Sequence, residues 1–243
     1  MLLKAKLLLD LIVGIVVLPL LASCQFSTTA APPLKWNTHV GDPPDTWINE
    51  SVAIGPDLVY VSAGQPQAGK FPCESRNYVQ AFDKATGTWK WHHEMGGCGA
   101  TAPTFFEDRV YIASSRWALQ AMDAQTGRLL WTFPSIENVV EQPPMGYPFL
   151  YDPAKPAVDN ERVYIVSMYS DDLAVYRGER KDGGSSLLAV NRQSGKLEWE
   201  FRVDKETDGE FTGPTVSQQA VSFVDDKILY VVDPQTGAEL WHS

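Results

Sequence analysis

Residues 121–131 read AMDAQTGRLLW, and the same order of residue types returns three more times along the chain. Each copy has Asp or Asn, two variable residues, Thr or Ser, Gly, three variable residues and Trp. The other copies are AFDKATGTWKW (81–91), AVNRQSGKLEW (189–199) and VVDPQTGAELW (231–241). Short strands that repeat with a period near ~40 residues are typical of the blades of a β-propeller. The repeat therefore predicts an all-β chain.

Each copy has the composition of a hairpin turn followed by a strand. The Asp or Asn side chain can accept hydrogen bonds from the backbone of its own turn, and the Gly can adopt a positive φ at no steric cost. After the third turn, Leu197, Trp199 and Phe201 fall on one face of a strand, and charged residues fall on the other. We expect each Trp to fill the wedge between neighbouring blades, which is a packing role and not a catalytic one.

The repeat resembles the tryptophan-docking motif of the pyrroloquinoline-quinone (PQQ)-like propeller superfamily, and the resemblance extends from Trp36 to Trp241. The superfamily contains quinone-dependent dehydrogenases and also non-enzymatic lipoproteins of the BamB type, so the fold alone does not separate an enzyme from a scaffold. The structural docking residues that the motif implies are Asp83, Gly87, Trp91, Asp123, Gly127, Trp131, Asn191, Gly195, Trp199, Asp233, Gly237 and Trp241.

The predicted architecture is a β-propeller of four-stranded antiparallel blades. Four blades are expected at about 48–93, 101–133, 155–203 and 213–242, after a lone outermost strand at Leu34–Val40. Because propellers of the superfamily have about seven or eight blades, the chain is expected to form part of a larger ring. Apolar blade faces do not stay bare in water, which leaves three alternatives. The chain is a truncated product or fragment, it pairs with a second copy, or it closes as an unusually small propeller.

The N-terminus has the pattern of an export signal. Two lysines precede an apolar run from Leu7 to Leu21, which is shorter than the ~20 residues of a membrane span. The run ends in LASC (21–24), which resembles a bacterial lipobox and predicts lipidation of Cys24. Residues 1–24 are then a lipoprotein signal peptide, residues 25–33 a flexible tether and residues 34–243 the propeller. An ordinary cleaved signal peptide and an N-terminal anchor are the alternatives.

These features predict a lipid-anchored protein of the bacterial cell envelope. Gln25 follows the predicted lipidated residue, where an Asp would resemble an inner-membrane retention signal. The periplasmic face of the outer membrane is therefore expected in a Gram-negative organism, and the outer face of the cell membrane otherwise.

Cys73 and Cys98 are the remaining cysteines. In an exported chain a cysteine pair favours a disulfide. The two residues lie at similar distances along the chain from Ala85, at the centre of the first hairpin, so antiparallel pairing would place them almost opposite each other. Two free thiols are the alternative.

The long loops all fall on one face of the predicted disc, and we expect the working surface there because ordering a long loop costs entropy. They are Ala63–Asn77, Met95–Ala100, Pro134–Ala154 and Tyr169–Ser185, of which the last is charged and expected to be solvated. Prolines in Pro134–Ala154 alternate with Met145, Tyr147, Phe149 and Tyr151, which we predict to be a partner-binding loop. The alternative is that these side chains fold back over the disc.

No local motif for a catalytic or metal site is found in the sequence. A quinone needs cationic clamps, a stacking aromatic and usually a calcium ion, and no segment matches this set, so neither PQQ nor calcium is expected. His92 and His93 would diverge on a strand. A formal net charge of −10 gives no electrostatic footprint for nucleic acid.

The favoured function is therefore an exported, lipid-anchored protein-interaction scaffold that is not an enzyme and works in the assembly of envelope or outer-membrane proteins. One alternative is a fragment or relative of a PQQ-dependent dehydrogenase. Another is a propeller that binds carbohydrate or a small ligand through the same loops. The expected partners are the membrane, proteins at the long-loop face and, if the ring is incomplete, a second copy of the chain.

Overall fold

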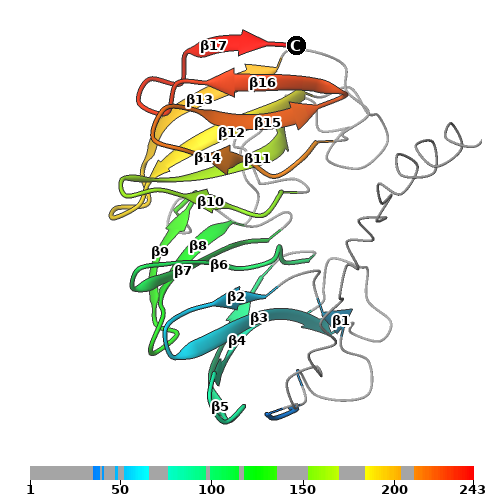
Figure 1. Ribbon diagram of the computed structural model, residues 1–243, viewed down its shortest axis with the longest axis vertical. Helices are drawn as coiled ribbons and strands as arrows, with labels where there is room; N and C mark the ends of the chain where they lie inside the picture. Colours follow the sequence, from blue (N-terminus) through cyan, green and yellow to red (C-terminus); the bar gives the residue numbers. More distant parts are fainter. Residues whose placement is uncertain are drawn as a thin grey trace, which may run out of the picture. The chain divides into compact units, whose positions relative to one another are not determined.

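A computed structural model describes the ranges 35–38, 40, 47–48, 52–65, 76–96, 99–114, 118–135, 153–169, 184–203 and 211–243. All of them belong to the second of two compact units, Lys35–Ser243. Within these ranges no helix has the length and apolar character that a bilayer span requires. The described part of the chain is built from strands, as the repeat predicts (Figure 1).

The strands form four antiparallel sheets, one for each copy of the repeat. The first sheet contains β1 (Trp47–Ile48), β2 (Ala53–Ile54), β3 (Leu58–Gln65), β4 (Arg76–Asp83) and β5 (Trp89–Met95). The second contains β6 (Thr104–Phe106), β7 (Arg109–Ala113), β8 (Leu119–Asp123) and β9 (Leu129–Phe133). The third contains β10 (Ala157–Val158), β11 (Arg162–Tyr169), β12 (Gly184–Asn191) and β13 (Leu197–Val203). The fourth contains β14 (Thr215–Val216), β15 (Val221–Asp225), β16 (Ile228–Val232) and β17 (Glu239–His242).

Two details differ from the strands expected from the sequence. The predicted first strand of blade one, from residue 48 to residue 54, is two short strands, β1 and β2, which pair with opposite ends of β3. The residues 35–38 and 40 of the predicted strand Leu34–Val40 form no strand among the described residues. A strand requires a partner edge, and no described strand pairs with this segment.

The last two strands of every sheet are joined by the same type of turn. In the second sheet the Asp123 carboxylate accepts hydrogen bonds from the backbone and hydroxyl of Thr126 at 2.8 and 2.7 Å, and Gly127 N–H donates to the Asp123 carbonyl at 2.9 Å. Gly127 has φ +71°, which a residue with a side chain adopts only with strain. A register shift follows at the same place in each sheet, at Ala81/Phe82, Ala121/Met122, Ala189/Val190 and Val231/Val232.

The four sheets are packed face to face in chain order through three apolar clusters (Figure 1). Val79 and Ala81 of β4 share the first cluster with Ile112 of β7, and Ala121 of β8 shares the second with Ile165 of β11. The third cluster joins the third and fourth sheets through Leu187 and Phe223. Strands buried on both faces explain the nearly continuous apolar runs in β7, β11 and β12.

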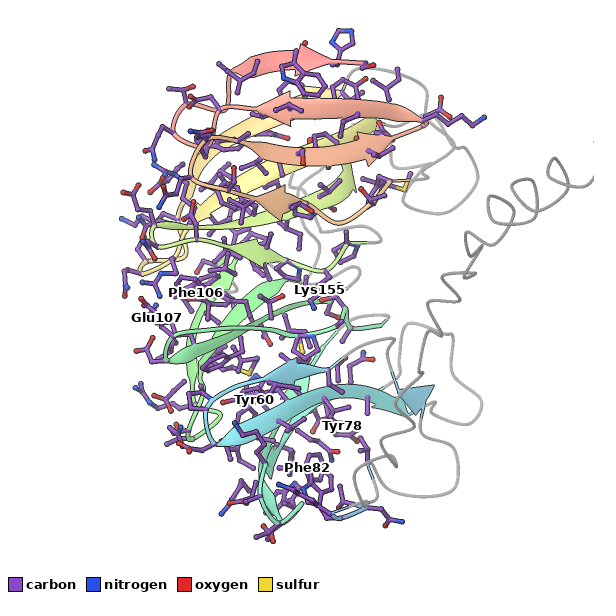
Figure 2. The ribbon with its side chains drawn as sticks, in the orientation of Figure 1. Tyr60, Tyr78, Phe82, Phe106, Glu107 and Lys155 are labelled. Carbon is purple, nitrogen blue, oxygen red and sulfur yellow. The ribbon has the colours of Figure 1, made fainter. Side chains whose placement is uncertain are left out.

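The two ends of the sheets differ. At one end, short turns join the first strand to the second and the third to the fourth, and we call this the tight-turn face. Phe106 and Glu107 mark it at the left of Figure 2, whereas Lys155, just before β10, lies toward the other end. The strand ends that border the loops predicted to form the working surface lie at that other end, and most residues of these loops are outside the described ranges.

Candidate functional site

Four tryptophans dock on the turn of the sheet that follows them. The indole N–H groups of Trp36, Trp91, Trp131 and Trp199 donate to the carbonyls of Lys84, Ala124, Arg192 and Pro234, at 2.9, 3.1, 2.9 and 3.2 Å. Each indole ring also lies against the turn glycine, and a Cβ built on Gly127 would stand 2.5 Å from the Trp91 ring. Only Gly leaves room for the ring, so the Trp and the next Gly form one interaction unit between sheets.

A Tyr and an Ala accompany the docked Trp in the first three sheets. Tyr60, Ala81 and Trp91 lie side by side on neighbouring strands of the first sheet. The ring centroids of the Tyr–Trp pairs are 5.9, 6.0 and 5.8 Å apart in the pairs Tyr60–Trp91, Tyr111–Trp131 and Tyr164–Trp199. The small Ala leaves room for the two rings to meet above it. The fourth sheet has Ser222 and Val231 beside Trp241 instead.

On the tight-turn face, a hydrogen bond ties the two turns of each of the first three sheets together. The N–H groups of Lys84, Ala124 and Arg192 donate to the carbonyls of Asp57, Asp108 and Glu161, at 2.8, 2.9 and 2.8 Å. The equivalent residue of the fourth sheet is Pro234, which has no N–H. The turn Ser217–Ala220 and the turn Asp233–Gly237 therefore lack this tie.

A hollow of about 460 Å³ lies where the tie is missing, within the ~300–1,000 Å³ of small-ligand sites. We call it the tight-turn hollow. Its residues come from the turns of the second, third and fourth sheets and are Phe106, Val158, Asp159, Asn160, Glu161, Val216, Ser217, Gln218, Pro234 and Gln235. We call its apolar members, Phe106, Val158, Val216 and Pro234, the floor, and the polar members are turn residues.

Ionic contacts hold the turns around the hollow in place. The Arg192 guanidinium lies 5.1 Å from the centroid of the Phe106 ring, pairs with Glu107 at 2.8 Å and donates from Nε to the Asn160 carbonyl at 3.0 Å. The Tyr164 hydroxyl donates to the Asp159 carboxylate at 2.7 Å. Burial of the phenol, and then this hydrogen bond, raise the pKa of Tyr164, so its hydroxyl remains a donor at neutral pH.

The comparisons with known proteins place the chain in a family. The family model described as outer membrane protein assembly factor BamB matches residues 75–243. The chain belongs to this family. A comparison with curated proteins gave no match.

Solved structures with the same fold include a BamB and a quinoprotein-type enzyme. BamB from Moraxella catarrhalis is 18% identical with a TM-score of 0.50, over 80% of this chain and 52% of that chain. A europium-containing methanol dehydrogenase is 15% identical with a TM-score of 0.55, over 81% of this chain and 41% of its own. The computationally designed Ika4 protein is 14% identical with a TM-score of 0.52, over 79% of this chain and 94% of its own. Identities this low show the fold alone.

The PQQ-like propeller fold predicted from the repeat is thus confirmed. The chain spans about half the length of the BamB structure, 52%. In this member of the BamB family, the contacts between a Trp and the next turn Gly join each sheet to the one that follows it.

Several predicted site residues fall outside the described part of the chain. They are Cys24, Cys73 and Cys98, the loop residues Met145, Tyr147, Phe149 and Tyr151, and the predicted signal peptide and tether at 1–33. The docking residues are all described and lie at the sheet-to-sheet contacts or, for Trp241, on the last strand.

The histidine pair lies on β5 (Trp89–Met95). The His92 ring contacts Tyr78 and Trp89, with centroids 6.1 and 5.9 Å away. His93 is half-buried, and burial lowers its pKa. No group of three or more His, Cys, Asp or Glu side chains in the described ranges is arranged to hold a metal ion.

Sequence reasoning missed the tight-turn hollow, because it looked for function where loops are long. One signal was available. The residue after the turn Asp or Asn is Lys84, Ala124 or Arg192 in three copies of the repeat and Pro234 in the fourth. A proline there removes a donor that the other copies use between turns.

Proposed function

We propose that the protein is an exported, lipid-anchored scaffold that binds other proteins during the assembly of envelope or outer-membrane proteins, without catalysing a reaction. The observation that carries the proposal is the match of the BamB family model, described as an outer membrane protein assembly factor, to residues 75–243. The export-type N-terminus and the LASC motif at 21–24 support a lipid anchor at Cys24.

The lipid anchor is tested by metabolic labelling. Cells that express the chain are grown with radioactive palmitate, and the purified protein is compared with Cys24→Ser. The proposal expects label in the parent protein and in the membrane fraction, and none in the variant. Equal labelling of the two proteins would contradict the anchor.

The protein partner is sought at the loop that contains Met145, Tyr147, Phe149 and Tyr151. Removing 145–151 should abolish the in-cell crosslinks of the chain to an outer-membrane assembly protein, while circular dichroism stays that of a β protein. The docking interactions described above lie outside this segment, so the deletion is expected to leave the sheets intact. Unchanged crosslinks in the deletion variant would argue against this loop as the contact.

A second candidate function is that of a quinoprotein relative. The methanol dehydrogenase with the same fold and a TM-score of 0.55 favours it. Adding pyrroloquinoline quinone with calcium or a lanthanide to the purified chain, followed by dialysis and an absorbance spectrum, decides between the two. A stoichiometric cofactor band that survives dialysis would favour the enzyme reading over the scaffold.

A further inference from the structure

The tight-turn hollow lies beside the two turns of the fourth sheet, which lack the hydrogen bond found in the other sheets. In the first three sheets, a backbone N–H after the turn Asp or Asn joins the two turns of the sheet. Pro234 cannot donate in this way and lines the hollow, while its carbonyl still accepts the Trp199 indole N–H at 3.2 Å. Docking of the preceding sheet is therefore kept, and only the tie within the fourth sheet is lost.

The rim of the hollow offers unused hydrogen-bonding groups. Asn160, Gln218 and Gln235 stand on three different turns and are exposed, and their side-chain amides form no hydrogen bond with another described residue. Each amide provides two donors and one acceptor. Because each amide both donates and accepts hydrogen bonds, the three side chains suit a ligand that carries both N–H and C=O groups.

The carboxylates at the hollow are already engaged. Asp159 accepts from Tyr164 and from the backbone N–H groups of Glu161 and Arg162, at 2.7, 2.8 and 2.7 Å. Glu161 pairs with Arg162 at 2.9 Å. The lining contains two carboxylates and no cationic side chain, so an anionic ligand is repelled and a cation gains little. An uncharged ligand fits best.

The floor favours an aliphatic group over a sugar ring. Phe106 is the single aromatic residue that lines the described hollow, and the Arg192 guanidinium already lies over its ring. The rest of the floor is Val158, Val216 and Pro234. Val158 and Val216 belong to β10 and β14, which are edge strands of their sheets. Edge strands leave backbone N–H and C=O groups available to an added chain.

We propose that the tight-turn hollow binds a short, extended and uncharged peptide segment, with an aliphatic side chain on the floor and its peptide groups on the Asn160, Gln218 and Gln235 amides. This inference deepens the scaffold proposal, on which it rests, by naming the chemistry of a bound partner segment. It places that contact on the tight-turn face.

The test is a titration of the full chain, labelled with ¹⁵N, with blocked pentapeptides of sequence Thr-Gly-Xaa-Gly-Thr, in which Xaa is Leu, Asp or Lys. Maltose serves as a neutral polyol. The Leu peptide is expected to shift the side-chain amide signals of Asn160, Gln218 and Gln235 saturably, while the Asp and Lys peptides bind at least about tenfold more weakly because their charges are desolvated without a partner.

The chain offers a matched control. Gln125 occupies the same position in the turn of the second sheet as Gln235 does in the fourth, and it does not line the hollow. Gln235→Ala and Gln218→Ala should each weaken the Leu peptide about fivefold, the effect of one lost hydrogen bond, and Gln125→Ala should not. In Pro234→Ala, the new amide at position 234 should be protected from hydrogen exchange, and peptide binding should fall.

Three results would overturn the inference. In the first, no peptide binds saturably, and in the second, maltose produces the same amide shifts as the Leu peptide with equal or greater affinity. The third concerns the variants. Equal binding by Gln235→Ala and Gln125→Ala would place any peptide elsewhere on the chain. None of these outcomes depends on crosslinking at 145–151, so the scaffold proposal and this inference can fail separately.

Discussion

The first three sheets and the fourth sheet bury their tryptophans to different extents. Trp91 and Trp131 are 7% and 9% exposed, and Trp199 is partly buried, whereas Trp241 is 50% exposed. The buried indoles lie against the glycine turn of the next sheet, and no described turn lies against Trp241. The motif is the same in all four copies, so the motif alone does not bury a tryptophan. The neighbouring sheet does.

The same comparison applies to the Tyr beside the Trp. Tyr60, Tyr111 and Tyr164 are fully buried at the sheet-to-sheet contacts, and Ser222 takes their place in the fourth sheet. In each sheet whose tryptophan is covered by the next sheet, a buried Tyr ring packs beside the indole. Four measurements test this difference between the sheets, in decreasing order of expected effect.

Replacing a docked tryptophan should have the largest effect. Trp131→Ala removes a buried indole and its hydrogen bond to the Arg192 carbonyl at 2.9 Å. We expect the free energy of unfolding in urea to fall by about 3–5 kcal/mol. A loss below about 1 kcal/mol would show that the docking unit is not a main source of stability.

The second effect comes from the partner of the tryptophan. Gly127→Ala forces a side chain into φ +71° and places its Cβ 2.5 Å from the Trp91 ring. We expect a loss of about 2 kcal/mol or more and a red shift of tryptophan fluorescence as Trp91 leaves its dock. Gln125→Ala, an exposed change in the same turn, is the control and should leave both observables unchanged.

The third effect is a loss of stability at high pH. Burial, with smaller contributions from Asp123 and Asp57, raises the pKa of Tyr60 to about 12, against ~10 in the unfolded chain. Between these values the unfolded state loses the proton first, so the stabilisation present below pH ~10 disappears as the pH rises toward 12. The expected loss is on the order of 2 kcal/mol.

Tyr60→Phe tests the assignment of this pH dependence. The Tyr60 hydroxyl has no hydrogen-bond partner among the described residues, so its removal should cost little at pH 7. Urea unfolding curves at pH 8, 10 and 11.5 should then show a flatter dependence in the variant. An identical slope in both proteins would assign the alkaline transition to other groups.

The smallest effect is expected on the fourth sheet. Trp241→Ala removes an indole that is half exposed, and we expect a change of about 1 kcal/mol or less. The measurement is made in the same urea series as Trp131→Ala. Equal losses at the two positions would show that packing within one sheet, and not docking on the next, stabilises the tryptophan.

Much of the fold was predictable because its signals are local. The turn residues Asp123 and Gly127 with the apolar strands around them predicted β8 and β9 to within one residue of the observed bounds. The first strands were less predictable. β10 and β14 have two residues each, pair on one edge only and carry too few side chains to show an alternation.

The candidate site was less predictable than the fold. The sequence led to the loops at 145–151 and to the long-loop face, whose residues mostly lie outside the described ranges. The tight-turn hollow is assembled from turns of three sheets, between Phe106 and Gln235. No local pattern predicts that Asn160, Gln218 and Gln235 line one hollow, because they stand on turns of different strand pairs.

The sequence by itself determined the type of fold, since an Asp or Asn that holds a turn, a Gly at positive φ and an alternating strand act within about ten residues. Only the tertiary structure decided which tryptophans are buried, which hydrogen bonds join the turns and where a hollow remains. These depend on what the next sheet places opposite a residue. Pro234 is an example, because its missing N–H removes a hydrogen bond to a different turn of the sheet and not one within its own turn.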